Sequence, residues 1–197
     1  MALIAQALVT ADEVDAYIQN QIATNDVVIE YLINGVSQQF ASYCDRAFIS
    51  TTYTATKIDG PGGAELYLPN WPVTTLTSVT EDDVLLTVDV DFYSYPASGM
   101  LTKFRSNWPW YDVAATWTTK QQGIVVTYAA GYTLALLPAD VKLAALKEIA
   151  RQYQVFVAKQ NGVASSSVSG SSSSASTPEK PGWMEALDRG GYRRRHL

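Results

Sequence analysis

The chain changes from strand to helix within residues 124–146, IVVTYAAGYTLALLPADVKLAAL, and this change decides the fold. The first part, Ile124–Ala129, is rich in β-branched residues and is typical of a strand. Leu137-Pro138-Ala139-Asp140 then begins a helix, because proline suits the first helical position and an acidic residue suits the first turn. Apolar residues recur every three or four positions from Val141 to Phe156, so the sequence predicts a long helix over about residues 138–160.

Two further helices are predicted near the N-terminus. Thr10-Ala11-Asp12-Glu13 has the pattern of a capping box, in which the Thr and Glu side chains each accept a backbone N–H, and it predicts a helix over about residues 11–22. A wide apolar stripe from Val28 to Tyr43 predicts a second helix over about residues 26–44.

Between these helices, residues 48–130 predict a compact antiparallel β-region. Short runs rich in β-branched and aromatic residues alternate there with turn signals. The glycines of Asp59–Gly63 form a turn rather than a phosphate loop, because no Gly-Lys-Ser/Thr and no helix follow. The predicted fold class is α+β, in which a helical bundle (two N-terminal helices plus a long C-terminal helix) carries an inserted antiparallel β-region and is followed by a flexible linker and an extended C-terminal tail.

The chain is predicted to have three parts: a body over residues 1–162, a linker over residues 163–177 and a tail over residues 178–197. The linker segment contains nine serines and no charged residue, which is a flexible-linker composition. A random coil of that length spans roughly 20 Å on average and at most about 50 Å.

The tail has the chemistry of a tethered binding peptide. Trp183, Met184 and Leu187 would share one face of a short helix. Tyr192 and the three arginines Arg193, Arg194 and Arg195 add an aromatic and a cationic end, and Trp and Arg are common interface anchors. We expect this segment to bind a partner; the alternative is an unstructured, solubilising tail.

Charge is unevenly distributed along the chain. The formal net charge is −5, which argues against a general nucleic-acid binder. Residues 1–100 hold 13 acidic and 2 basic residues, whereas residues 101–197 hold 6 acidic and 12 basic residues. One interpretation is that acidic and basic faces of identical subunits meet head to tail in a ring. The other is chance plus a basic tail.

No catalytic, metal or cofactor site is expected. Cys44 is the one cysteine and His196 the one histidine, which excludes a disulfide within the chain and a Cys-based zinc site and disfavours a triad with a histidine base. Asp89 and Asp91 would face one side of a strand, but no ligand nearby completes a magnesium site, so a solvated strand face is favoured. The sequence contains no run of about 18 apolar residues, so no membrane span is expected. The N-terminus lacks the basic region of a signal peptide. We therefore expect a soluble protein of a reducing compartment.

An aromatic cluster lies in a predicted loop of the β-region. It consists of Trp108, Trp110 and Tyr111, interrupted by a proline. Such residues could stack on sugar rings, but aromatic side chains more often belong to a core or a subunit interface, which we favour.

Several short segments occur in a recognisable order between residues 8 and 160. They are Tyr43–Phe48, Leu66–Pro69, Trp71–Val79, Val125–Tyr132 and Leu137–Leu146. The most specific pieces are Pro-Val-x-x-Leu-x-Ser-Val and Thr-Tyr-x-Ala-Gly-Tyr followed by Leu-Pro-Ala-Asp. In this order the chain resembles the head–tail connector (adaptor) family of tailed bacteriophages and prophages, although its long Ser-rich linker departs from the compact members.

The resemblance implies a non-enzymatic ring protein of the virion neck, synthesised in the host cytoplasm. Such adaptors dock as a dodecamer beneath the portal protein, extend the DNA channel and offer a platform to a stopper or tail-completion protein. DNA passes without specific binding, and no membrane is involved. Family members grip the portal with their C-terminal segment, which here corresponds to Trp183–Arg195.

Two further expectations concern the channel and an alternative function. A channel that lets DNA slide should be acidic or neutral, and Asp12, Glu13 and Asp15 are candidates for its wall. The alternative function is a carbohydrate- or surface-binding β-module that uses exposed Trp and Tyr residues.

Overall fold

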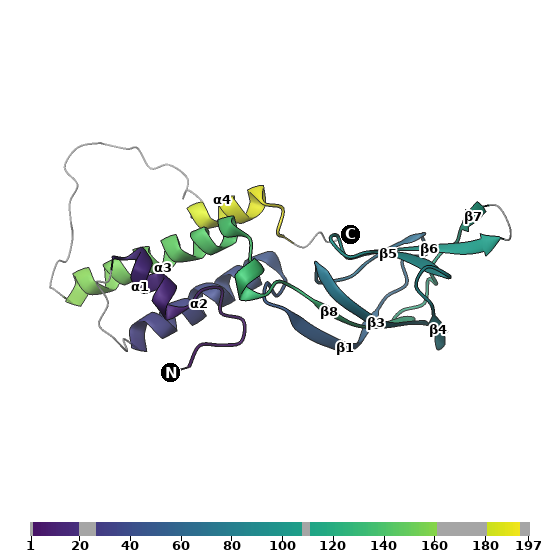
Figure 1. Cartoon of the computed structure of the whole chain (residues 1–197), viewed down its shortest axis with the longest axis horizontal. Coiled ribbons are helices and arrows are strands. Elements are labelled where there is room, and N and C mark those ends of the chain that lie inside the picture. Colours follow the sequence, from purple (N-terminus) through teal and green to yellow (C-terminus); the bar gives the residue numbers. More distant parts are fainter. Residues whose placement is uncertain (1, 20–26, 108–110, 161–180, 194–197) are drawn as a thin grey trace. The chain divides into compact units, whose positions relative to one another are not determined.

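The computed structural model describes residues 2–19, 27–107, 111–160 and 181–193, and Figure 1 shows its helices and strands. The chain divides into two compact units: a helical unit formed by Met1–Asp45 and Leu134–Leu197, and a β unit formed by Arg46–Thr133. The β unit is therefore an insertion in the helical unit, as the sequence predicted for the β-region. Within the described residues, no helix is long and apolar enough to cross a membrane.

The first helix, α1 (Ala11–Tyr17), has the predicted capping box. Thr10 Oγ1 accepts from the Glu13 amide at 3.2 Å, and Glu13 Oε2 accepts from the Thr10 amide at 3.0 Å. The helix ends earlier than the predicted residue 22. Gln19 adopts a φ of 63°, in the left-handed region that stops a helix, and residues 20–26 lie outside the described residues.

Helices α2 (Val27–Cys44) and α3 (Ala139–Gln160) form the core of the helical unit, and their bounds agree with the predicted ones within one residue wherever those bounds are described. Their apolar stripes face inward, as the periodicity predicted. The fully or almost fully buried members of these stripes are Ile29, Ile33, Val36, Phe40, Val141, Ala145 and Ile149. A salt bridge of 2.7 Å between Lys142 Nζ and Glu13 Oε1 ties α3 to α1.

The helical unit contains a fourth α-helix, formed by the C-terminal tail. This helix, α4 (Gly182–Arg189), lies alongside α3 in Figure 1, with the short 3₁₀ helix η1 (Leu134–Leu136) preceding α3 in the chain. The tail is thus not wholly extended, and α4 packs on its own chain.

The β unit contains two sheets. The first is antiparallel with the order β1-β8-β3-β4, and its strands are β1 (Thr51–Ile58), β3 (Val73–Glu81), β4 (Val84–Leu86) and β8 (Ile124–Ala130). The second has the order β2-β6-β5, with β7 also paired to β6, and its strands are β2 (Glu65–Tyr67), β5 (Phe92–Tyr95), β6 (Met100–Asn107) and β7 (Tyr111–Ala114). The antiparallel β-region of the sequence analysis, and with it the α+β class, is confirmed.

One apolar core joins the two sheets of the β unit. Its buried members come from both, and the largest are Leu66, Leu68, Phe92, Leu101, Trp117, Ile124 and Tyr128. A buried ion pair adds a polar link, because Lys103 Nζ of β6 contacts the Glu81 carboxylate of β3. The other carboxylate oxygen of Glu81 accepts from the Thr118 amide at 2.7 Å, so both oxygens are satisfied.

Three of the sequence pieces that suggested the family are hydrogen-bonded to one another in the β unit, through Phe48, Pro72 and the Gly131-Tyr132 pair. The Gly131 amide donates to Pro72 O at 2.9 Å, and the Tyr132 amide donates to Phe48 O at 2.7 Å. Gly131 has a φ of 115°, and a Cβ there would lie 2.8 Å from the carbonyl carbon of Ile49. Only glycine tolerates both the conformation and the close approach at this position.

Candidate functional site

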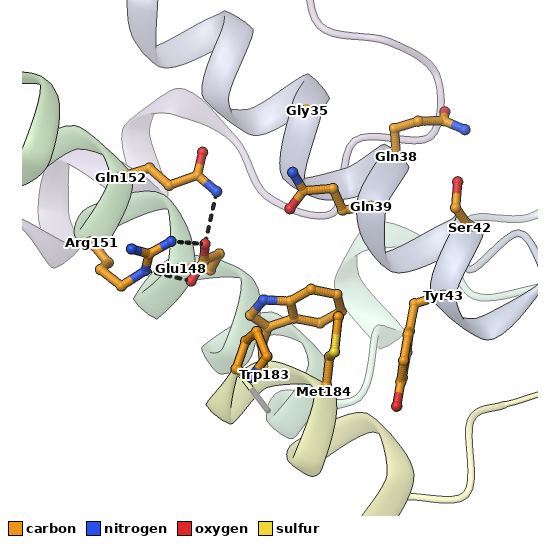
Figure 2. A pocket seen from close by; sticks show the side chains of 11 residues that line it. Gly35, Gln38, Gln39, Ser42, Tyr43, Glu148, Arg151, Gln152, Trp183 and Met184 are labelled. Atoms are coloured by element: carbon orange, nitrogen blue, oxygen red, sulfur yellow. Dashed lines mark hydrogen bonds and ion pairs between the residues drawn. The ribbon is translucent and has the colours of Figure 1, made fainter. Parts of the chain in front are cut away.

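The tail helix α4 is seated on α2 and α3 of its own chain. The Trp183 ring stacks on Phe40 with a centroid distance of 4.8 Å and an interplanar angle of 18°. Tyr43 meets the same ring edge-on at 5.4 Å. Figure 2 shows Trp183 in this position, with Tyr43 and Met184 beside it. We call this surface, formed by Phe40, Tyr43 and the facing part of α3, the α4 seat.

The side chains of α4 that are buried or partly buried include the three that the sequence predicted on one helix face. Leu187 is 0% exposed, whereas Trp183 and Met184 are partly buried. Fully burying a leucine side chain contributes about 1.5–3 kcal/mol. Leu187 therefore holds α4 on the body, and in this conformation it offers no surface to a partner.

Polar contacts hold the C-terminal end of α4. Tyr43 donates from its hydroxyl to Asp188 Oδ2 at 2.8 Å, and Tyr192 donates to Asp140 Oδ1 at 2.9 Å. The Arg193 guanidinium lies 5.0 Å from the centre of the Tyr43 ring. Burial and the hydrogen bond to Asp188 raise the pKa of Tyr43 above its ordinary value of 10.0.

Two hollows flank the seated helix. The α2 groove has a volume of about 660 Å³ and lies between α2, α3 and the start of α4 (Figure 2); its polar lining includes Gln38, Gln39 and Gln152. The α3 groove has a volume of about 390 Å³ and lies between α3 and α4; its lining includes Leu143, Lys147 and Trp183. Open grooves with mixed linings suit protein segments rather than a small enclosed ligand.

The carboxylate between the two grooves belongs to Glu148, and its oxygens are fully engaged. It accepts from Arg151 Nε at 2.9 Å, from Arg151 Nη2 at 2.6 Å and from Gln152 Nε2 at 2.8 Å (Figure 2). The hydrogen bonds from Arg151 lower the pKa of Glu148 below 4.5 despite its burial. A carboxylate with both oxygens held in this way orders the Arg151 and Gln152 side chains beside the two grooves. Within the described part of the chain, no cluster of three or more His, Cys, Asp or Glu residues could hold a metal ion.

Comparison with known protein families shows to which family the chain belongs. The sequence profile of the head completion protein family matches residues 7–180, which is most of the chain. The chain belongs to the head completion protein family. The predicted membership of a bacteriophage head–tail connector family is thereby confirmed.

Solved structures share the fold of this head completion protein. A chain in the neck of an empty gene transfer agent (GTA) particle, computed with C6 symmetry, has a TM-score of 0.53 at 16% identity. A chain in the virion of the native GTA particle has a TM-score of 0.52 at 16% identity, and one in the native neck computed with C12 symmetry has 0.50 at 17%. Each likeness covers 100% of this chain and 94% of the other. No curated protein sequence matches this chain.

Other predicted sites of the head completion protein are only partly described. Trp108 and Trp110 lie outside the described residues, as do Arg194 and Arg195, and of Tyr111 only the backbone position in β7 is described. The sugar-binding alternative is therefore not tested by the described residues. The placement of the paired carboxylates Asp89 and Asp91 on a strand face was wrong.

The two carboxylates lie in the turn between β4 and β5. Asp91 Oδ2 accepts from the Thr87 amide at 2.8 Å, and Asp89 adopts a φ of 62°. Aspartate is common in such turns because it bonds nearby amides and tolerates the left-handed conformation. Both aspartates are therefore turn residues and do not lie on a strand face.

The sequence analysis missed the α4 seat on the body. Phe40 and Tyr43 were assigned to the general core stripe of α2, and Asp140 to a helix start. The three-residue spacing of the two aromatic residues puts both on one helix face, which was a usable signal. It could not distinguish a seat for the chain's own tail from an ordinary helix contact.

Proposed function

We propose that this head completion protein is a structural head–tail connector that forms a dodecameric ring under the portal, extends the DNA channel and joins the capsid vertex to the tail. The family match over residues 7–180 is the observation that carries the proposal. The shared fold with chains of the GTA neck, computed with C6 and C12 symmetry, supports a ring and a position in the virion neck. A non-enzymatic, structural role is supported by the family match.

The portal contact is assigned to the tail segment Trp183–Arg195, with α4 still seated. Trp183 and Leu187 fix α4 to the body, where one stacks on Phe40 and the other is fully buried. The partly exposed Met184 and the exposed Arg193 are available to the portal in this conformation. A seated helix is already ordered, so binding costs less conformational entropy than it would for a free peptide. A stopper or tail-completion protein would bind the opposite side of the ring.

The channel wall is assigned to acidic or neutral residues. Asp12 on α1 is exposed and remains a candidate. Glu13 is a weaker candidate, because its carboxylate is held by Lys142 at 2.7 Å and caps α1. An acidic wall would repel DNA phosphates and let the duplex slide.

Complementation of defective particles tests the proposed function. Particles assembled without this protein should accumulate as filled heads without tails, and adding the purified protein should restore tail attachment. Heads that acquire tails equally well without the protein would refute the connector role.

A further inference from the structure

The β unit exposes an apolar hairpin at the edge of its first sheet. Among the described strands, β4 pairs with β3 alone, over three residues, after a turn in which Asp82 and Asp83 adopt φ values of 47° and 69°. Val84 is 62% exposed and Leu85 is 67% exposed. We call Asp82–Leu85 the hairpin tip. Large apolar side chains gathered at an exposed edge indicate a contact surface.

The hairpin tip is acidic as well as apolar. Asp82 and Asp83 are both exposed, and Lys120 Nζ lies 3.4 Å from Asp82 Oδ1. A surface that accepts this tip must therefore offer apolar area with positive charge beside it.

The α3 groove of the helical unit offers this combination. Leu143 is 43% exposed, and Lys147 and Arg151 follow at successive four-residue steps on the same face of α3. All three line the groove, whose other wall is formed by α4 residues including Trp183 and Ala186. Arg151 is held by two hydrogen bonds to Glu148, whose carboxylate offsets its charge, and Asp140 also lines the groove. The positive charge offered to a partner therefore comes from Lys147.

We propose that the hairpin tip of one subunit docks in the α3 groove of a neighbouring copy of this chain. Leu85 enters the groove against Leu143, and Asp83 faces Lys147. The inference rests on the proposed ring, because two different surfaces on every subunit make a head-to-tail contact, which can close into a ring. In this contact, an acidic segment from the first half of one subunit faces a basic residue from the second half of its neighbour, as the uneven charge distribution suggested.

A charge exchange tests the contact. Asp83→Lys and Lys147→Glu should each reduce ring assembly on tailless capsids by about tenfold or more, measured by co-sedimentation and electron microscopy, since a like-charge pair replaces an attractive one. The double variant Asp83→Lys/Lys147→Glu restores opposite charges across every interface and should recover most of the assembly. Asp83→Asn controls for the left-handed turn, and Lys57→Glu on β1 applies the same charge change at another exposed lysine.

The outcomes separate the two proposals. If the wild-type protein does not attach to tailless capsids at all, the proposed function fails. If the wild-type protein attaches and either single variant assembles equally well, the docking inference is overturned while the function stands. Failure of both single variants without recovery in the double variant also overturns it, because the groove would then bind another protein.

A cysteine pair gives an independent readout. Leu85→Cys/Leu143→Cys should produce a disulfide-linked ladder of subunits in assembled necks under mild oxidation, whereas a variant with only one of the two substitutions should not, because the native Cys44 is buried. A double variant that remains a single band on a denaturing gel would contradict the contact.

Discussion

Tyr43 of α2 donates a hydrogen bond to Asp188 of α4 over 2.8 Å, although the two residues are 145 positions apart in the chain. This bond closes the C-terminal end of the α4 seat, next to the stack of Trp183 on Phe40. It makes α4 part of the helical unit, so we expect substitutions in the tail to change the stability of that unit.

Removing the tail should destabilise the helical unit. Leu187→Ala should lower the free energy of unfolding by about 2–4 kcal/mol, because the side chain is fully buried. Truncation after residue 162 should lower it at least as much. Urea denaturation measures both effects, and Glu185→Ala on the exposed face of α4 is the control, with a loss below about 1 kcal/mol. An unchanged midpoint after truncation would mean that α4 does not remain seated in solution.

The Tyr43–Asp188 bond should weaken at alkaline pH. The raised pKa of Tyr43 means that its contribution to stability is complete below pH 10.0 and is lost as the pH rises through the higher folded value. Tyr43→Phe should cost about 0.5–1.5 kcal/mol at neutral pH and should reduce the alkaline loss of stability. An alkaline profile that is identical in the variant would assign that loss to other groups.

Acid should destabilise the helical unit through Glu148 and Glu13. Hydrogen bonds from Arg151 lower the pKa of Glu148. Burial raises the pKa of Glu13, but bonds from Lys142 and Thr10 outweigh it and lower the value. Both carboxylates stabilise the fold above pH 4.5, and this contribution disappears as the pH falls through their lowered values. Thermal unfolding between pH 6 and pH 2 should show a shallower acid decline for Glu148→Gln than for wild type.

The ion pair in the β unit should be sensitive to loss of one partner. Glu81→Leu leaves the Lys103 ammonium in a largely buried position and the Thr118 amide unpaired. We expect a loss of about 3–5 kcal/mol in the free energy of unfolding, typical of a broken buried pair. Asp82→Asn removes the charge of the exposed neighbouring position while tolerating its φ of 47°, and it should cost less than about 1 kcal/mol. Equal costs for the two variants would show that the buried pair contributes no more than the surface one.

Portal attachment should survive when α4 is locked in its seat. A bifunctional thiol crosslinker between Tyr43→Cys and Asp188→Cys would prevent release of the helix. Crosslinked protein should bind isolated portal rings at least as well as the uncrosslinked variant, because the portal-binding side chains remain outside. Loss of binding on crosslinking, with recovery after cleavage of a reducible linker, would show that α4 leaves its seat to reach the portal.

Local patterns predicted most of the fold, because they depend on neighbours in the sequence. The Thr10–Glu13 capping box and the apolar stripe of α3 set helix positions within a few residues. β8, Ile124–Ala130, agrees within one residue with the predicted strand Ile124–Ala129. The end of α1 differed, since the left-handed conformation of Gln19 has no strong sequence signal.

The candidate site was less predictable, because it depends on which apolar surfaces meet. The amphipathic face of Trp183 and Leu187 was visible in the sequence, but an apolar face does not show whether its partner is another protein or the same chain. The contacts of Trp183 with Phe40 and Tyr43 identify the partner as the same chain, and they become visible only when the positions of α2 and α4 are known. The division into a helical and a β unit likewise follows from contacts distant in sequence.

Cryo-electron microscopy of the neck, reconstituted from tailless capsids and the purified protein, tests the central claim most directly. The account predicts a closed ring of twelve copies beneath the portal, with an open central channel and α4 seated against α2 and α3 of a subunit. Capsids whose portal carries no added ring, under conditions in which the protein restores tail attachment, would contradict it.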